Sequence, residues 1–225
     1  MAYDEGPMRA ASVAALLLWS ALAGGALARA DETGPHLIYL HGRIIQEQQN
    51  ARPRHPEFGY YELDQILATF RERGFVVAGG IRPKGESMSA SANRVVEQVR
   101  GLVASGVPAS RITVVGGSMG ATIALLSSAR LQNPELRFGV LAACMSESVP
   151  RLLAEQGKRP AGRVLSIREK SDETSEPCPP WKGDADSRAT LVVREIVLDT
   201  GLRHGFLYRP LREWVEPVAE WATER

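Results

Sequence analysis

The sequence has few cysteines, no excess of charge of either sign and no internal repeat. Two cysteines in 225 residues exclude a disulfide-dense scaffold and a four-cysteine zinc site. The 27 lysines and arginines nearly balance 26 aspartates and glutamates, so no basic field points to a nucleic-acid partner. No segment recurs at a period of about 20 to 50 residues, which argues against a solenoid. A composition of 44% hydrophobic and 24% charged residues is that of an ordinary globular domain.

Residues 1–30 have the pattern of a secretory signal peptide. Residues 10–28 carry no charged side chain, and their centre at 13–22 is strongly apolar. Small residues follow, and the segment ends in Ala-Arg-Ala at 28–30, which is an A-x-A cleavage site. Cleavage after Ala30, or after Ala28 through Ala-Leu-Ala, would leave a single domain, residues 31–225 in the first case. We therefore expect an exported protein, either periplasmic or secreted.

The very start of this segment departs from the signal pattern. Asp4 and Glu5 precede a single Arg9, whereas a signal peptide begins with a basic region. A true start at Met8 would restore that region. The alternative is an uncleaved membrane anchor, because the 19 uncharged residues at 10–28 are just long enough to span a bilayer. The paired glycines at 24–25 and the cleavage site favour removal, which leaves no stable membrane insertion.

From residue 36 onward, short apolar runs alternate with segments of helical periodicity. The runs suit strands buried on both faces of a parallel sheet, at 37–40, 75–79, 112–115, 138–143, 164–167 and 195–198. Helices are predicted at 62–73, 91–102, 119–131 and 211–221, with Pro217 kinking or breaking the last. This alternation predicts an α/β protein, a mostly parallel sheet of about six strands with helices on both faces in a three-layer sandwich. Ligands bind at the carboxyl ends of the strands in such sheets.

A G-x-S-x-G motif follows the third of these strands directly and precedes the third helix. It reads Gly116-Gly117-Ser118-Met119-Gly120. A nucleophile on a sharp strand-to-helix turn projects its oxygen out of the fold, and Gly116 and Gly120 let strand and helix approach closely. The Met119 N–H at the helix N-terminus can donate to a developing oxyanion. A glycine- and serine-rich turn without chemistry is the alternative.

In register over residues 36–210, the chain resembles the α/β-hydrolase superfamily. The first strand ends in His41-Gly42-Arg43, where that family has a His-Gly before its oxyanion loop. The next strand leads into Gly-Gly-Ile-Arg-Pro-Lys-Gly-Glu-Ser at 79–87, similar to an R-G-x-G-x-S loop. Ser118, Asp172 and His204 then follow in the family order of nucleophile, acid and base.

The resemblance implies a catalytic triad with these roles. His204 is the only one of the four histidines that follows both the nucleophile and the acid, and would act as general base and acid. Asp172 would orient His204, but other acids compete for this role. Glu169, Glu173 and Glu176 crowd the same loop, and Glu147 stands where some members carry the acid.

Further residues gain roles from the same resemblance. The second oxyanion donor would be the backbone N–H of Arg43. His41 would support the oxyanion loop or contact substrate, and Arg82 would contact substrate or form a salt bridge within its loop. Trp181, in the Pro-rich stretch around Cys178, is a candidate apolar contact.

Two other features concern the surroundings of the site. Arg52, Arg54 and His55 lie in a long loop, either as a basic rim that favours anionic acyl groups or as a solvated loop. Cys144 and Cys178 follow two strands that should be neighbours, and export permits a disulfide between them, two buried thiols being the alternative. Residues 145–163 leave room for only one short helix, so we expect no cap domain and a site shielded only by loops.

Serine at the elbow argues against the aspartate-dependent dehalogenases and epoxide hydrolases of the superfamily, and against its cysteine-dependent branch. No metal-binding motif and no phosphate-binding loop with a lysine occurs, so we expect neither metal nor cofactor. The sequence therefore predicts a serine esterase that hydrolyses a small or accessible acyl ester through an acyl-enzyme. Two alternatives remain: a peptidase or amidase with the same triad, and a binding protein that keeps the fold without catalysis.

Overall fold

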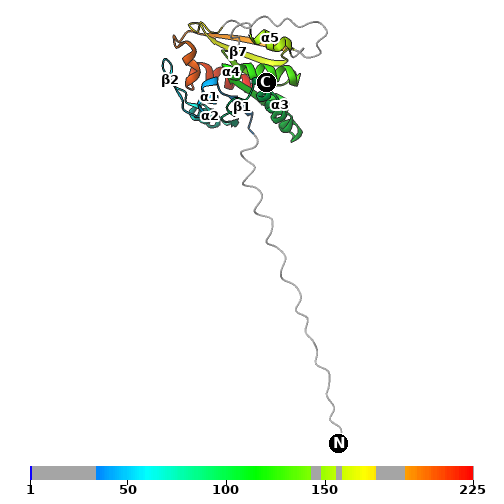
Figure 1. Ribbon diagram of the computed structural model, residues 1–225. Helices are drawn as coiled ribbons and strands as arrows, with labels where there is room; N and C mark the ends of the chain where they lie inside the picture. The colour runs from blue at the N-terminus through cyan, green and yellow to red at the C-terminus, as the bar shows by residue number, and fades with distance from the viewer. Residues whose placement is uncertain (2–33, 143–147, 156–158, 176–190, 225) are drawn as a thin grey trace. The chain divides into compact units, whose positions relative to one another are not determined.

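The computed structural model describes Met1 and residues 34–142, 148–155, 159–175 and 191–224 (Figure 1). Residues 2–30 of the predicted signal peptide lie outside these residues, as do Cys144, Glu147, Glu176, Cys178 and Trp181. What the sequence predicts for them therefore stays a prediction. None of the helices in the described ranges combines the length and apolar character that a membrane crossing needs.

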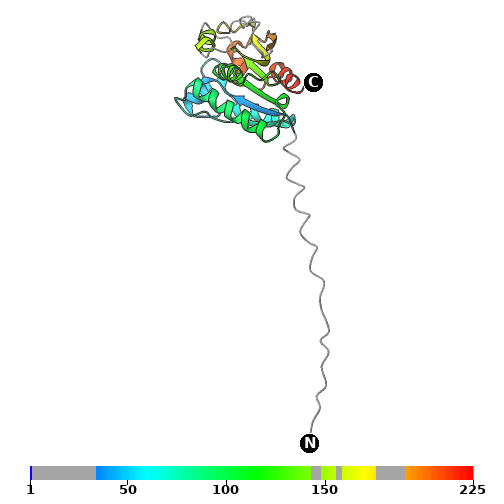
Figure 2. The same cartoon turned by 90° about the vertical axis from the view of Figure 1, so that its right-hand side faces the viewer.

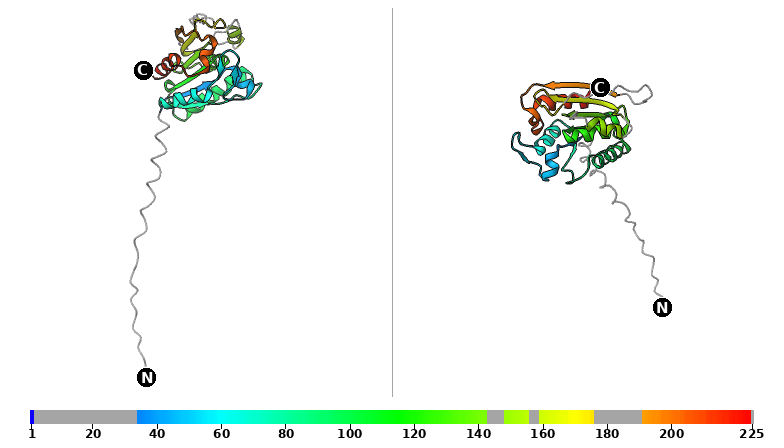
Figure 3. Two further views of the ribbon diagram at one scale, coloured as in Figure 1. Left: turned by 90° about the vertical axis from the view of Figure 1, so that its left-hand side faces the viewer. Right: turned by 45° about the horizontal axis from the view of Figure 1, so that its top comes forward.

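Within the described residues, six parallel strands form the central sheet, as the alternating pattern predicted. Their order across the sheet is β4-β1-β5-β6-β7-β8, with β4 and β8 at the edges. Figure 3, right, shows β8, in orange, at one edge. The bounds are His36–Leu40 for β1, Val76–Gly79 for β4, Ile112–Gly117 for β5, Arg137–Leu141 for β6, Gly162–Glu169 for β7 and Leu191–Leu198 for β8. Each predicted run overlaps one of these strands; the run 138–143 extends two residues beyond β6, and the last of these lies outside the described residues. A separate antiparallel pair, β2 (Arg54–His55) and β3 (Gly59–Tyr60), was not predicted.

Helices cover both faces of the sheet. The side chains of α2 (Leu63–Glu72) and α6 (Arg212–Thr223) pack into one hydrophobic cluster, together with the 3-10 segment η2 (Arg203–Tyr208). The other cluster contains α3 (Met88–Ala104), α4 (Met119–Leu131) and α5 (Ser148–Glu155), with α3 and α4 side by side (Figure 2). Two further short helical segments are α1 (Arg43–Gln48) and η1 (Ala109–Arg111). Between β6 and β7 the described residues hold α5 alone, in agreement with the predicted capless architecture.

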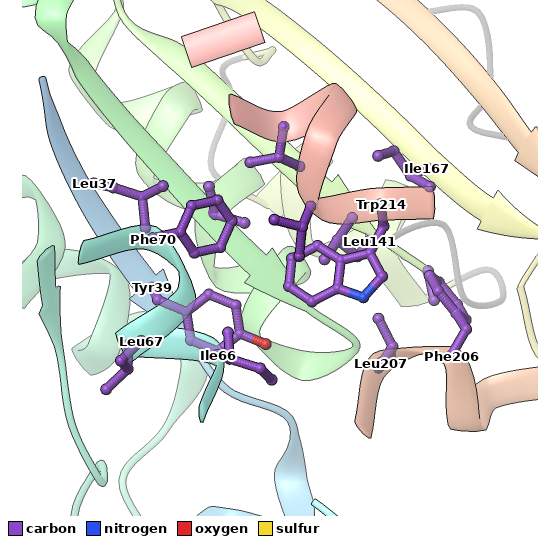
Figure 4. Packing of buried hydrophobic residues seen from close by; sticks show 14 of the residues in the cluster. Leu37, Tyr39, Ile66, Leu67, Phe70, Leu141, Ile167, Phe206, Leu207 and Trp214 are labelled. Atoms are coloured by element: carbon purple, nitrogen blue, oxygen red, sulfur yellow. The ribbon is translucent and has the colours of Figure 1, made fainter. Parts of the chain in front are cut away.

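Strand β1 shows how the sequence pattern divides the core. Leu37 and Tyr39 belong to the cluster under α2 and α6, whereas Ile38 and Leu40 belong to the cluster under α3 and α4. Successive side chains of a strand point to opposite faces, so an uninterrupted apolar run serves a sheet covered on both sides. Burying a large apolar side chain contributes about 1.5–3 kcal/mol. Figure 4 shows part of the first cluster, where Phe206 and Leu207 of η2 point toward Trp214 of α6.

Pro217 lies inside α6 and does not break it. The helix runs from Arg212 to Thr223 around the proline. Proline removes one backbone donor, but α6 buries Trp214, Val218 and Trp221 against the sheet. Tertiary packing of this apolar face therefore outweighs the local preference to end the helix.

The chain reverses its direction across the sheet next to β1. It passes from β1 to the edge strand β4 and then returns to β5 on the other side of β1. Leu40 at the end of β1 pairs with Gly116 near the end of β5. The carboxyl ends of these two strands therefore flank a topological switch point, where open α/β sheets bind their ligands.

Candidate active site

Ser118 lies at this switch point, between the end of β5 and the start of α4. Its backbone angles are φ 55° and ψ −121°, a region that residues other than glycine rarely adopt. Its N–H donates to the Leu141 carbonyl at 2.9 Å, and its own carbonyl accepts from the Ala121 N–H at 2.9 Å. A strained turn that its surroundings hold in place costs about 1–3 kcal/mol and is typical of functional positions.

The glycines of the motif are required by close backbone contacts. A Cβ on Gly116 would lie 2.2 Å from the carbonyl oxygen of Gly120. A Cβ on Gly120 would lie 2.0 Å from the carbonyl oxygen of Leu40, at the end of β1. Both distances are far below van der Waals contact. The first turn of α4 can therefore approach β1 and β5 only because these positions have no side chain.

Asp172 and His204 form a hydrogen-bonded pair. Asp172 follows β7, His204 follows β8 within η2, and His204 Nδ1 lies 2.7 Å from Asp172 Oδ2. An ionised carboxylate only accepts, so Nδ1 carries the proton and Nε2 remains as the basic nitrogen. Burial would raise the pKa of Asp172, but hydrogen bonds from His204 and Thr174 outweigh burial and lower the pKa below its usual value. Asp172 is thus ionised and orients the imidazole.

One cavity of about 420 Å³ brings the predicted nucleophile and base together. Ser118 and His204 both line it, with Gly42 and Arg43 from the end of β1. The segment η2 reaches this side of the sheet because Phe206, Leu207 and Tyr208 are buried in the core. A Cβ on Gly117 would lie 3.3 Å from the Leu207 side chain, so η2 packs directly on the end of β5.

Glu169, a competing acid, has a different role. It is fully buried at the end of β7 and accepts hydrogen bonds from the backbone and hydroxyl of both Ser171 and Thr200, and from the Gly201 N–H. Burial would raise the pKa of Glu169, but the bonds from Thr200 and Ser171 outweigh it and lower the pKa. The carboxylate thereby ties the loop that carries Asp172 to the loop that carries His204. The third acid within the described part of this loop, Glu173, is exposed.

The backbone donors expected for an oxyanion hole both stand at helix starts. Met119 is the first residue of α4, and Arg43 is the first residue of α1. The first N–H groups of a helix have no acceptor within it and are available to a ligand. A Cβ on Gly42 would lie 3.7 Å from Ser118 Cβ, so the two helix starts adjoin at the serine.

His41 and Arg82 lie behind the site and support the turn at Gly42. His41 is fully buried, its Nδ1 donates to the Gly42 carbonyl at 2.8 Å, and its Nε2 accepts from the Arg82 N–H at 3.0 Å. Burial and the charge of Arg82 lower the pKa of His41 to about 4, so the ring is neutral. Arg82 is buried and donates from Nη2 to the His41 carbonyl at 2.7 Å. Neither residue lines the cavity at Ser118, so this placement favours the supporting role over substrate contact.

Aromatic side chains from three segments form a wall of the cavity that sequence reasoning missed. Phe58 in the turn between β2 and β3 stacks on His55, with ring centroids 4.5 Å apart, and lies 6.2 Å from the His204 ring. Tyr61 and Tyr208 complete the wall. The Tyr61 hydroxyl is 2.8 Å from that of Tyr39. The only sequence signal was the expectation that loops shield the site, among them the long loop that carries Arg52, Arg54 and His55.

No protein-family model matches the chain, and no curated protein matches it. Solved structures do match. Est1E from Butyrivibrio proteoclasticus superposes with a TM-score of 0.52 at 16% identity, covering 86% of this chain and 88% of that one. MGS-MChE2, an alpha/beta hydrolase enzyme from a metagenome of lagoon sediments at Mar Chica, Morocco, gives 0.51 at 17% identity, with 85% and 92% covered.

A putative dipeptidyl aminopeptidase IV from Bacteroides ovatus also matches, with a TM-score of 0.51 at 15% identity. The match covers 85% of this chain but 31% of that larger one. At such identities the likeness concerns the fold. Together with the six-stranded parallel sheet and the strained Ser118 turn, it identifies the chain as an α/β-hydrolase-fold protein, as the resemblance in the sequence predicted.

Proposed function

We propose that the protein is a serine hydrolase that cleaves an acyl ester through an acyl-enzyme on Ser118. One observation carries the proposal: Ser118, in a strained turn, and His204, held by a buried Asp172, line the same cavity. A non-catalytic binding protein has no need for this combination. Activated nucleophiles depend on such a base, itself oriented by a third group.

The proposed reaction has two halves. His204 Nε2 takes the proton of Ser118 Oγ as that oxygen attacks the ester carbonyl. The backbone N–H groups of Met119 and Arg43 stabilise the oxyanion, and His204 then protonates the leaving alcohol. A water activated by His204 next attacks the acyl-enzyme, and Ser118 regains its proton as the carboxylic acid leaves. The charge of His204 in each transition state is balanced by Asp172.

The first test is the intact mass of the purified protein after treatment with a fluorophosphonate. We expect one adduct on the wild type and none on Ser118→Ala. We also expect Ser118→Ala and His204→Ala to lose about 10⁴- to 10⁶-fold in kcat on a short p-nitrophenyl ester. Circular dichroism checks that both variants fold. Unchanged turnover by Ser118→Ala, or no adduct on a folded wild type, would contradict the proposal and favour the binding-protein alternative.

Ester and amide substrates share this machinery, so a second assay separates them. The same enzyme is given matched p-nitrophenyl ester and p-nitroanilide substrates with one acyl group, followed by a peptide library. We expect turnover of the ester at least about 100-fold above that of the anilide, because the amide is the harder bond to cleave with the same triad. Comparable rates, or efficient cleavage of peptides, would favour the peptidase alternative.

A further inference from the structure

We infer that the cavity at Ser118 selects esters that carry a carboxylate close to the scissile carbonyl, bound by Arg43 and Arg54. The inference rests on the proposed function and adds a substrate class to it. Three observations support it: the charge of the residues that line the cavity, the pairing of the acids near it with other arginines, and the aromatic and aliphatic side chains that also line it.

Two arginines and one glutamate are the charged residues that line the cavity, apart from the histidines. Arg43 begins α1, directly after the turn at Gly42, and Arg54 lies in β2. Within the described residues, no carboxylate oxygen forms an ion pair with either guanidinium. This includes Glu47, which also lines the cavity one helical turn after Arg43. The walls therefore carry a net positive charge.

The neighbouring arginines are neutralised, which sets these two apart. Arg52, two residues before Arg54, binds Glu62 at 2.9 Å and lies over the Tyr60 ring. Arg203, next to His204, pairs with Glu57. Glu62 and Glu57 are thus paired with arginines that do not line the cavity. The basic loop predicted from the sequence separates into one paired arginine and one that faces the site.

The rest of the cavity lining is largely apolar. It includes Phe58, Tyr61, Leu207 and Tyr208. A cavity of about 420 Å³ lined by two arginines and by aromatic side chains suits a small ester with a carboxylate at one end. A neutral ester would partly desolvate a guanidinium and offer it no partner, whereas a carboxylate can form a bidentate, charge-assisted pair.

The test compares p-nitrophenyl hemisuccinate with its methyl ester, which is neutral and of similar length. We expect wild-type kcat/KM to be at least about tenfold higher for the anionic ester, and the excess to shrink from 50 mM to 500 mM salt through screening. Arg54→Gln should lower the ratio about fivefold. Arg52→Gln should leave it unchanged, because Arg52 is paired with Glu62. Glu47→Gln should raise it about two- to threefold.

A second pair of substrates tests whether the carboxylate is bound on the acyl side or on the alcohol side of the ester. Esters of butyrate with p-hydroxybenzoate carry it on the alcohol side, and hemisuccinates carry it on the acyl side. A preference for either over its neutral methyl ester supports the inference and shows which side faces the arginines. A ratio near one for both, in an enzyme that hydrolyses the neutral esters, overturns the inference and leaves the proposed function standing.

A binding measurement tests the same selectivity in the absence of turnover. Ser118→Ala, checked for folding, is titrated with the hemisuccinate and with its methyl ester in a calorimeter. Tighter binding of the anion by at least about fivefold, lost in the Ser118→Ala, Arg54→Gln double variant, supports the inference. Equal affinity overturns it. Absence of a fluorophosphonate adduct on the wild type, by contrast, overturns the proposed function itself.

Discussion

At the scale of single residues, the site depends on positions where the backbone leaves no choice of side chain. Ser118 keeps its strained conformation because both of its flanks are fixed: β5 is fully buried, and α4 is packed against β1, β5 and β6. The glycines at 116 and 120 are part of the same constraint, because backbone atoms of Gly120 and Leu40 occupy the space of their missing side chains. The motif therefore meets a steric requirement of the turn as well as placing a serine there.

Gly120→Ala should destabilise the protein strongly. The added Cβ would lie 2.0 Å from the Leu40 carbonyl oxygen, and backbone atoms cannot move aside without disturbing the sheet. We expect the free energy of unfolding, measured by urea denaturation, to fall by about 3 kcal/mol or more. The matched control is Gly101→Ala in α3, where nothing lies within 4 Å of the added Cβ and where alanine should stabilise by about 0.5–1 kcal/mol. Equal effects of the two substitutions would show that the close approach at Gly120 does not exist.

His41 should make stability depend on pH below neutrality. An unfolded histidine binds a proton near pH 6.5, whereas burial and Arg82 hold the folded pKa at about 4. Protonation in this window therefore favours the unfolded chain, and stability that is present above pH 6.5 falls as the pH approaches 4. The difference between the two pKa values corresponds to about 3 kcal/mol.

The measurement is the free energy of unfolding against pH for the wild type and for His41→Asn. The variant should lose the dependence due to one proton between pH 6.5 and 4, whatever its overall stability. Nitrogen NMR of the wild-type ring should show the neutral Nδ1–H tautomer at pH 5.5, because Nδ1 donates to Gly42 and Nε2 accepts from Arg82. A protonated ring at pH 6 would contradict this account.

At the scale of elements, two loops from neighbouring strands must be held together for the acid and base to meet. Asp172 follows β7 and His204 follows β8, and the strands pair in parallel up to Glu169 and Leu198. Beyond the paired residues, the Glu169 carboxylate links the two loops by accepting hydrogen bonds from Ser171 and Thr200. Glu169 is thus a positioning residue, acting on both loops without touching the imidazole.

Glu169→Gln should lower both stability and kcat. The amide would turn a nitrogen toward N–H groups that now donate to a carboxylate, so we expect a loss of about 2–3 kcal/mol at pH 7. The folded pKa of Glu169 lies below the unfolded value of about 4.3. Its contribution is therefore full above that pH and is lost on further acidification, so the wild type and variant should converge in acid.

Kinetics distinguish positioning from plain stability. Loosening the Asp172–His204 pair should reduce kcat by about tenfold or more at a temperature where the variant is fully folded, with little change in KM. Glu173→Gln, the matched control on the exposed side of the same loop, should leave kcat and stability within error. If Glu169→Gln kept the wild-type kcat and the wild-type dependence of stability on acid pH, Glu169 would not have the positioning role.

The sequence predicted those elements whose own residues show a clear apolar pattern or a terminal motif. Helix α4 was predicted at its observed bounds, because the G-x-S-x-G turn starts it and its apolar residues are buried on most sides. The short α1 and the β2–β3 pair were missed, since six- and two-residue elements have no periodicity to read. Strand β8 begins at Leu191, but only residues 195–198 were predicted. The prediction was too short because the charged Arg194 interrupts the apolar run at an exposed sheet edge.

The candidate site was predictable to different degrees for the same physical reason. Ser118 stood in a local motif, and His204 followed from the chain order of the family that the sequence resembles, so both could be proposed before the structure was known. The choice between Glu169 and Asp172 needed geometry, because both carboxylates follow β7 and only the turn decides which one faces His204. The aromatic wall depended on η2 crossing to β5, which no short-range pattern encodes.

At the scale of the whole molecule, the remaining predictions concern where the protein acts and how it is cross-linked. The fold begins near residue 34, shortly after the A-x-A sites at 26–30, so removal of the signal would leave β1 intact. Export would place Cys144 and Cys178 in an oxidising compartment. A bridge between them would close a loop of about 35 residues and add about 3–4 kcal/mol in the chain-entropy model.

We expect the full chain, expressed in a bacterium with a periplasm, to be recovered from that compartment with its signal removed. Intact mass should match a chain that begins at Asp31 or at Arg29, and should lie about 2 mass units below the reduced form if the cysteines are joined. Ala30→Asp with Ala28→Asp should block cleavage, because small residues are needed at these positions. A mature chain that keeps residues 1–30 and sediments with membranes would instead support the uncleaved anchor, for which the 19 uncharged residues are long enough. The Ser118 site would be the same in both cases, but an anchored enzyme would meet its esters at the membrane surface.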